Sequence, residues 1–303
     1  MDGYSVYVPR LMPQAENFVA GRRSCKGCGK ALTARIASKA AEASVFSQAL
    51  IKERYPAAES FSAQGYALDD VSSEVLIENF LSYIDRINEQ SFKKTNSRHR
   101  IIKKAVIGIN RQIFMSDFLA LERVLQIPGP ALYICFDNEP YIDKLIQRAS
   151  QPPFVLAEKP LPITDEDISR IIQEKQMPAA VTESDFTYIA TACPSLPYDL
   201  IDKVRKGLDS PGNAFLLVLA PCPTGWIFAP ENTIKLGLSA VRTGYFPLYE
   251  IEEKKFRLTT QIKKRKPVQE FFMMQKRFFT FPQELIPSFQ TAVDMFYNEL
   301  LSK

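Results

Sequence analysis

Three cysteines have the spacing of a metal site. Cys25 and Cys28 are separated by two residues in the run Cys-Lys-Gly-Cys-Gly, and Cys222 lies far along the chain. This pattern suits a metal ion or an iron–sulfur cluster better than a disulfide, because thiolates at such a spacing can face one ion. Gly27 and Gly29 allow the backbone to curve around the ion without side-chain clashes. We predict an iron–sulfur cluster here; a zinc site completed by another donor, or thiols without a ligand, are the alternatives.

The other reactive residue types indicate no second chemistry. Five cysteines, an odd and sparse set, argue against a disulfide framework and favour a reducing, cytoplasmic compartment. Cys135 lies within an apolar run and Cys193 follows a predicted strand, so both are expected to be structural. The single histidine, His99, stands in a basic connector where we expect a solvated surface position. This setting does not suit histidine-based acid–base or triad chemistry.

The composition is that of an ordinary globular protein. The 303 residues are 46% hydrophobic and 24% charged, with a net charge of +4, a balance that requires neither nucleic acid nor a membrane. No apolar run reaches the ~20 residues that span a bilayer, and the first residues lack the pattern of a secretory signal. The 12 glycines fall below the usual share of ~7%. Few glycines disfavour a phosphate-binding loop, where the backbone must approach the ligand closely.

The elements that would position these residues alternate between strands and helices. Strands are predicted at 101–109, 131–136, 186–191 and 213–219, and helices at 30–43, 73–89, 115–126, 165–176, 198–208 and 284–301. Residues 151–163 are a proline-rich loop, and 242–266 hold turns and short extended pieces. Alternation of this kind predicts right-handed βαβ units and a mostly parallel sheet. Binding residues should then lie at the carboxyl ends of the strands, at 108–111, 137–144, 191–195 and 221–226.

Several blocks of sequence match one family in order. They lie at 24–29, 132–148, 190–200, 219–226 and 243–270, and 219–226 is the most specific. Through them the chain resembles the β subunit of 2-oxoacid:ferredoxin oxidoreductases, which binds thiamine diphosphate, Mg²⁺ and a [4Fe–4S] cluster. The resemblance implies a thiamine diphosphate-binding-type, doubly wound α/β fold with a mostly parallel sheet. It also implies an N-terminal arm at 1–24, a cofactor-binding-like domain with cluster-type cysteines at 25–230, and a C-terminal helical extension for subunit packing at 231–303.

The chain departs from this family where the cofactor should bind. The family's Gly-Asp-Gly strand end, whose Asp holds Mg²⁺, reads Gly-Ile-Asn at 108–110, and its later Asn-Thr-Gly reads Asp-Lys-Leu at 143–145. Only Asn110, Asn138 and Lys144 remain as weak anchors, and neutral oxygens alone hold Mg²⁺ poorly. Arg111 and Lys144 either bind phosphate, fill the place of the metal, or have no role there. We expect thiamine diphosphate and Mg²⁺ to be absent or weakly bound, and no residue to be catalytic.

The cluster motif departs less. The family uses four cysteines, and Cys25, Cys28 and Cys222 match three of them. Alignment on the Tyr-Pro pair at 55–56 places Ser47 at the fourth position. The resemblance therefore implies a [4Fe–4S] site of three cysteines and Ser47, although a serine oxygen is a harder and poorer ligand for cluster iron than a thiolate.

These features predict a β-subunit-like component of a multisubunit 2-oxoacid:ferredoxin oxidoreductase. Its thiamine diphosphate site would be degraded, and its role would be structural or that of an electron relay. The expected partners are α- and γ-like subunits and a ferredoxin or ferredoxin-like subunit, which the basic run at 263–266 would attract unless it is only a solvated loop. The alternatives are an active thiamine diphosphate-dependent subunit with an atypical diphosphate anchor, and a structural subunit without a cofactor.

Overall fold

The structure is a computed structural model that describes residues 24–40, 105–111, 131–150, 162–176, 179–182 and 185–303. Three expected elements, the helices at 73–89 and 115–126 and most of the proline-rich loop, lie outside these residues, as do the N-terminal arm, Ser47 and His99. Within the described residues, no helix is long and apolar enough to cross a bilayer.

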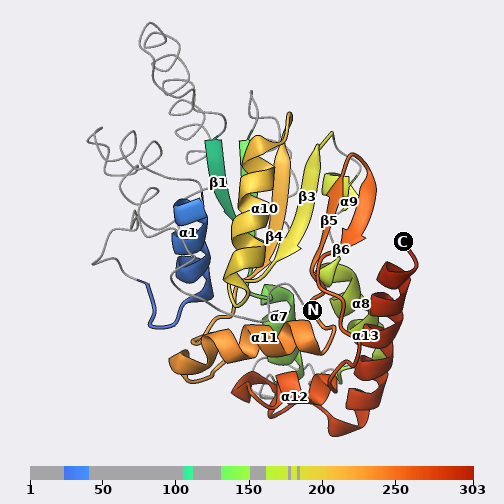
Figure 1. Cartoon of the computed structure of the whole chain (residues 1–303). Coiled ribbons are helices and arrows are strands. Elements are labelled where there is room, and N and C mark those ends of the chain that lie inside the picture. Colours follow the sequence, from blue (N-terminus) through green and yellow to red (C-terminus); the bar gives the residue numbers. More distant parts are fainter. Residues whose placement is uncertain (1–23, 41–104, 112–130, 151–161, 177–178, 183–184) are drawn as a thin grey trace, which may run out of the picture.

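One six-stranded sheet organises the described chain (Figure 1). The strand order is β1-β2-β4-β3-β5-β6. The first four of these strands pair in parallel, and β5 and β6 complete the sheet as an antiparallel hairpin. The strands are β1 (Ala105–Asn110), β2 (Ala131–Asp137), β3 (Tyr188–Ala192), β4 (Ala214–Leu219), β5 (Tyr249–Glu252) and β6 (Lys255–Leu258).

Helices cover both faces of the sheet and create two hydrophobic cores. Alternate residues of β2 point to opposite faces: Leu132 and Ile134 pack in the core under the first helix pair, α1 and α10, while Tyr133 and Cys135 pack in the core under the remaining helices. All seven residues of β2 are buried, as expected for a strand covered on both sides. The helices are α1 (Gly29–Ala40), α7 (Pro140–Ser150), α8 (Asp165–Lys175), α9 (Ala179–Thr182), α10 (Pro197–Asp209), α11 (Thr233–Arg242), α12 (Val268–Phe272) and α13 (Ile286–Leu301), with short 3₁₀ turns at Pro230–Asn232, Lys276–Phe278 and Gln283–Leu285.

Local signals fix the ends of several helices. Thr164 and Asp167 form a capping box at the start of α8: the Thr164 hydroxyl accepts from the Asp167 backbone N–H, and the Asp167 carboxylate accepts from the Thr164 backbone N–H. This reciprocal pair satisfies two amides that would otherwise be unbonded. Pro197 occupies the first turn of α10, where its missing N–H costs nothing.

The predicted α/β class is confirmed, and so are the predicted strands and helices that lie within the described residues. One local expectation is wrong. The resemblance places 143–145 in the turn that reaches the diphosphate, but this segment lies inside α7, which begins at Pro140 directly after β2. Without the family's glycine nothing interrupts the helix, and Pro140 favours its first turn. Helix α11 was also not predicted, because its apolar positions are spread over only ten residues.

Parallel pairing brings three strand ends to one edge of the sheet. In register, Asn110 of β1 is paired with Phe136 of β2, and Asp137 is paired with Leu219 of β4. The segment that follows β4 continues beside this edge, because the Ala220 N–H donates to the Asp137 carbonyl at 2.7 Å. The edge therefore holds the turn after β2 next to the loop that carries Cys222.

Candidate functional site

The two cysteine-bearing loops are docked on each other through glycines. The Gly29 N–H donates to the Pro221 carbonyl at 3.0 Å, and a Cβ on Gly29 would lie 2.6 Å from the Pro221 nitrogen. Gly27 has a φ of +72°, and a Cβ there would lie 2.5 Å from the Pro230 carbonyl oxygen. A side chain fits at neither position, so these glycines are required for the loops to meet.

The thiols at this junction form no disulfide and differ in exposure. Cys25 is exposed, whereas Cys28 and Cys222 are half-buried. Burial raises the pKa of the Cys222 thiol, the Gly225 N–H lowers it by donating to the sulfur at 3.3 Å, and the nearby charge of Cys28 raises it. The structure thus brings Cys28 and Cys222 within electrostatic range of one another.

The arrangement has the features of a sulfur-ligated group. N–H···S bonds of the Gly225 type stabilise metal-bound thiolates, and Gly29 lies directly against the backbone of Ala220 and Pro221, next to Cys222. Within the described part of the chain, no three Cys, His, Asp or Glu side chains are already grouped as metal ligands. Ser47 lies outside that part, so the four-ligand assignment stays a prediction.

The turn after β2 is a buried carboxylate site. Asp137 accepts from the Glu139 N–H at 2.8 Å and from the Tyr141 hydroxyl at 3.2 Å. Burial raises the pKa of Asp137, and the charge of Arg111 opposes that rise only in part. Glu139 has a φ of +57°, a left-handed conformation that is costly for a residue other than glycine and recurs at functional sites.

Glu139 is held by two buried cations. Its carboxylate forms ion pairs with Lys175 from α8 and with Arg277 from the C-terminal segment, and all three side chains are almost fully buried. Burial alone would raise the pKa of Glu139, but the charges of Lys175 and Arg277 outweigh it and the pKa is lowered. The Lys175 Nζ also lies 3.4 Å from the centroid of the Tyr245 ring. Glu139 is therefore ionised and fully neutralised inside the protein.

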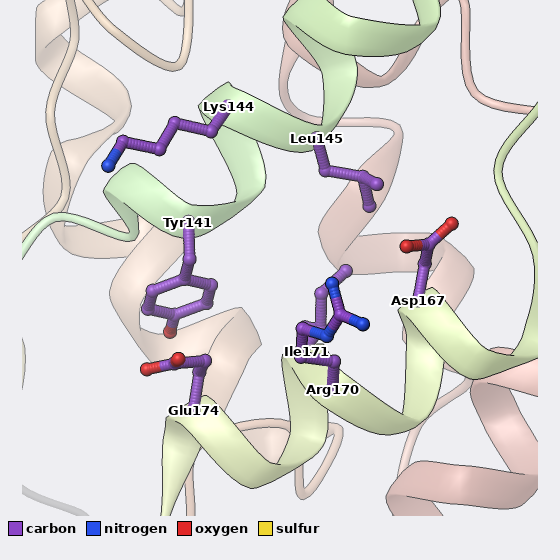
Figure 2. A pocket seen from close by; sticks show the side chains of 7 residues that line it. All are labelled: Tyr141, Lys144, Leu145, Asp167, Arg170, Ile171 and Glu174. Carbon is purple, nitrogen blue, oxygen red and sulfur yellow. The ribbon is translucent and has the colours of Figure 1, made fainter. Parts of the chain in front are cut away.

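The three weak anchors expected at the diphosphate position come from different elements. Asn110 ends β1, but its side chain is not among those described. Asn138 is half-buried, and its carbonyl accepts from the Trp226 indole N–H at 2.8 Å. Lys144 is exposed and lines a groove of about 220 Å³ between α7 and α8. Figure 2 shows the Lys144 side chain pointing away from the groove's apolar residues, Leu145 and Ile171.

Arg111 is buried at the tip of β1. Its guanidinium donates to the Glu174 carbonyl at 2.6 Å and to the Glu174 carboxylate at 3.2 Å. Burial tends to lower the pKa of Arg111, but the negative charge of Asp137 and other neighbours raises it. A cation therefore stands beside the strand end at which the resemblance implies a magnesium ligand.

Sequence reasoning missed the two cations of the Glu139 site. The burial of Lys175 could have been predicted, because Lys175 follows Ile168, Ile171 and Ile172 at helical spacing. It therefore belongs to the apolar face of α8. The burial of Arg277 has no such local signal in the sequence. Its partner Glu139 lies in a distant part of the chain, so the pairing depends on the tertiary fold.

Comparison with characterised proteins identifies the family. No family model matches the chain. Pyruvate synthase subunit PorB of Methanocaldococcus jannaschii is 34% identical over 93% of this chain and 95% of that protein. PorB of Methanothermobacter marburgensis is 32% identical over 95% of this chain and 99% of its own length, and ketoisovalerate oxidoreductase subunit VorB of Pyrococcus abyssi is 30% identical over 88% and 86%. The chain belongs to the family of β subunits of 2-oxoacid:ferredoxin oxidoreductases.

Proposed function

We propose that this β subunit works within a multisubunit 2-oxoacid:ferredoxin oxidoreductase, with a degraded thiamine diphosphate site and a role as an electron relay. Its relatives are named as subunits of pyruvate synthase and ketoisovalerate oxidoreductase, which supports α- and γ-like partner subunits. A ferredoxin or ferredoxin-like subunit is the proposed electron partner, and the exposed lysines Lys263 and Lys264 would attract an acidic one.

The degraded-site proposal rests on the carboxylates of the turn after β2: Asp137 is buried and hydrogen-bonded, and Glu139 is neutralised, while the strand end at 108–110 reads Gly-Ile-Asn and offers no carboxylate. A magnesium ion with a diphosphate needs carboxylate oxygens free to coordinate it. Here Lys175 and Arg277 already occupy the Glu139 carboxylate, and the cation Arg111 stands at the neighbouring strand end. A divalent cation on Glu139 would have to displace buried ion pairs, which leaves uncompensated charges in the interior. The residues present do not fit Mg²⁺ and thiamine diphosphate.

The types and spacing of the residues around Cys222 support an iron–sulfur cluster at this junction. Cys25, Cys28 and Cys222 would hold it, with Ser47 as the fourth ligand, and the cluster would supply single-electron transfer when bound. The chain's own contribution is to dock the two loops through Gly27 and Gly29 and to donate the Gly225 N–H to the Cys222 sulfur. The half-buried position of Cys28 and Cys222 limits access of water to the sulfurs.

Two other functions make different predictions for the purified assembly. A working thiamine enzyme anchored by Asn110, Asn138 and Lys144 predicts stoichiometric thiamine diphosphate and Mg²⁺. The Lys144 side chain is exposed and points away from Leu145 and Ile171 (Figure 2). A cofactor-free structural subunit predicts a colourless protein without iron. The proposed relay predicts iron without thiamine diphosphate on this subunit.

Substitution of Cys222 tests the relay directly. We expect the anaerobically purified complex to contain iron on this subunit and to show an electron paramagnetic resonance signal that Cys222→Ala removes, because the cluster loses a ligand. Cys135→Ala is the matched control, since Cys135 is buried within β2. Ser47→Cys should raise the iron content, because thiolate is the better ligand. Unchanged iron and signal in Cys222→Ala would rule out the ligand assignment.

A further inference from the structure

Trp226 physically joins the two candidate sites. It is the only tryptophan in the chain and is fully buried. Its backbone N–H donates to the Cys222 carbonyl at 2.8 Å, while its indole N–H donates to the Asn138 carbonyl in the β2 turn at 2.8 Å. One residue is therefore bonded to the cysteine loop on one side and to the carboxylate turn on the other.

Arg277 fixes Trp226 in this position. Its guanidinium carbon lies 4.2 Å from the centroid of the indole ring, a cation–π contact that is strong when both groups are buried. The same guanidinium pairs with Glu139 and donates to Asp143 at 3.1 Å, and its backbone N–H donates to the Trp226 carbonyl at 3.4 Å. The Nε donor is taken by Gln275 at 2.9 Å. A rigid planar donor with all these partners has little freedom to move.

The network reaches the Cys222 sulfur. Asp143, held by Arg277, has a carboxylate oxygen 3.5 Å from the point where a Cβ on Gly225 would lie. The Gly225 N–H donates to the Cys222 sulfur at 3.3 Å. The path from Glu139 to the Cys222 loop thus runs through Arg277 and Trp226, which is hydrogen-bonded to the Cys222 carbonyl, and Asp143 lies close to Gly225 beside it.

We propose that Arg277 is a positioning residue that couples the turn after β2 to the cysteine site, so that the charge at Glu139 sets the ligand geometry at Cys222. The proposal rests on the proposed metal-binding role of the cysteines. It goes beyond that role because it makes Arg277, in the C-terminal segment, the residue that sets the position of the cysteine loop relative to the turn after β2. Coupling of this kind requires a contiguous set of packed and hydrogen-bonded groups, which Glu139, Arg277, Trp226 and Asp143 provide.

A double-mutant cycle on the full-length chain tests this coupling. Zn²⁺ serves as the probe of the cysteine site, and its dissociation constant is measured under anaerobic conditions by competition with a chromogenic chelator. The ion-pair partners of Glu139 are Lys175 and Arg277, and neither belongs to the cysteine loop. We expect Glu139→Gln to weaken Zn²⁺ binding about tenfold, the lower end of the range for groups that orient metal ligands, but less than twofold when Arg277→Met is already present.

Arg277→Lys keeps the positive charge but loses the planar guanidinium that bonds both Glu139 and Asp143 and lies over the Trp226 ring. This variant remains informative if Glu139→Gln fails to fold. We expect it to weaken Zn²⁺ binding several-fold and to shift the emission maximum of Trp226, the single fluorescent tryptophan. Arg265→Met is the matched control: Arg265 also pairs with an acid, Asp294 at 2.8 Å, and stacks on an aromatic ring, Tyr297 at 4.7 Å. It should alter neither quantity.

The outcomes separate this inference from the proposed function. If Cys222→Ala leaves Zn²⁺ binding unchanged, the cysteines are not ligands, and both the proposed function and the coupling are wrong. If Cys222→Ala abolishes binding while Glu139→Gln and Arg277→Lys leave it unchanged, the cysteine site stands and the coupling alone is overturned. Additive effects of Glu139→Gln and Arg277→Met would likewise contradict the coupling.

Discussion

At the scale of single residues, the turn after β2 is defined by charges that no local pattern reveals. From the sequence, Glu139 only marks the end of a strand, whereas the structure shows it buried and paired with Lys175 and Arg277. A buried ion needs such partners, because desolvation of a lone carboxylate is very costly. Pairing between distant residues follows from the tertiary fold, so the sequence reveals the types of charge present but not which of them meet.

Removal of Lys175 should destabilise the protein strongly. Lys175→Met leaves the buried Glu139 with one cation instead of two, and we expect a loss of about 3 kcal/mol in the free energy of unfolding. Lys206→Met is the control, because Lys206 pairs with Glu250 at 2.7 Å but its side chain is 37% exposed, so its loss should cost less than about 1 kcal/mol. Urea denaturation of both variants measures the difference; equal losses would contradict the burial argument.

At the scale of elements, the sequence predicts those with strong periodicity and clear ends. Strand β2 is predicted because it is a continuous apolar run, and helix α8 because it has an acidic first turn. Helix α7 is missed because it begins at Pro140, and a proline after a strand resembles a turn. Helix α11 is missed because it is only ten residues long, too short for a clear apolar periodicity. The prediction that glycines shape the cysteine loop has a structural counterpart in the contacts of Gly27 and Gly29.

Gly29→Ala should disrupt the docking of the cysteine loops. The added Cβ would lie 2.6 and 2.7 Å from backbone atoms of Pro221 and Ala220, which cannot move as a side chain can. We expect lower iron content per chain in the purified complex, because the loop carrying Cys25 and Cys28 separates from Cys222. In the control Gly207→Ala, the new Cβ meets the flexible end of Leu132 at 2.7 Å, and iron content should stay unchanged. Equal iron in both variants would show that the docking does not support the site.

At the scale of the whole molecule, the α/β class and the family membership were both accessible from the sequence. Blocks such as 219–226 carry the resemblance, and the relatives confirm it over most of the chain. The sheet then explains why distant motifs converge, since β2 and β4 pair in parallel and the segments that follow them, the β2 turn and the Cys222 loop, meet at one edge. The sequence could not show that the C-terminal segment reaches into this edge through Arg277, because that contact depends on how α11 to α13 pack.

A density map of the anaerobically purified native assembly is the most direct test of the degraded cofactor site. We expect Arg277 and Lys175 on the Glu139 carboxylate, as in the present structure, and no diphosphate at the ends of β1 and β2 in this subunit. Thiamine diphosphate bound there with a divalent cation, and the two basic side chains displaced, would contradict the account.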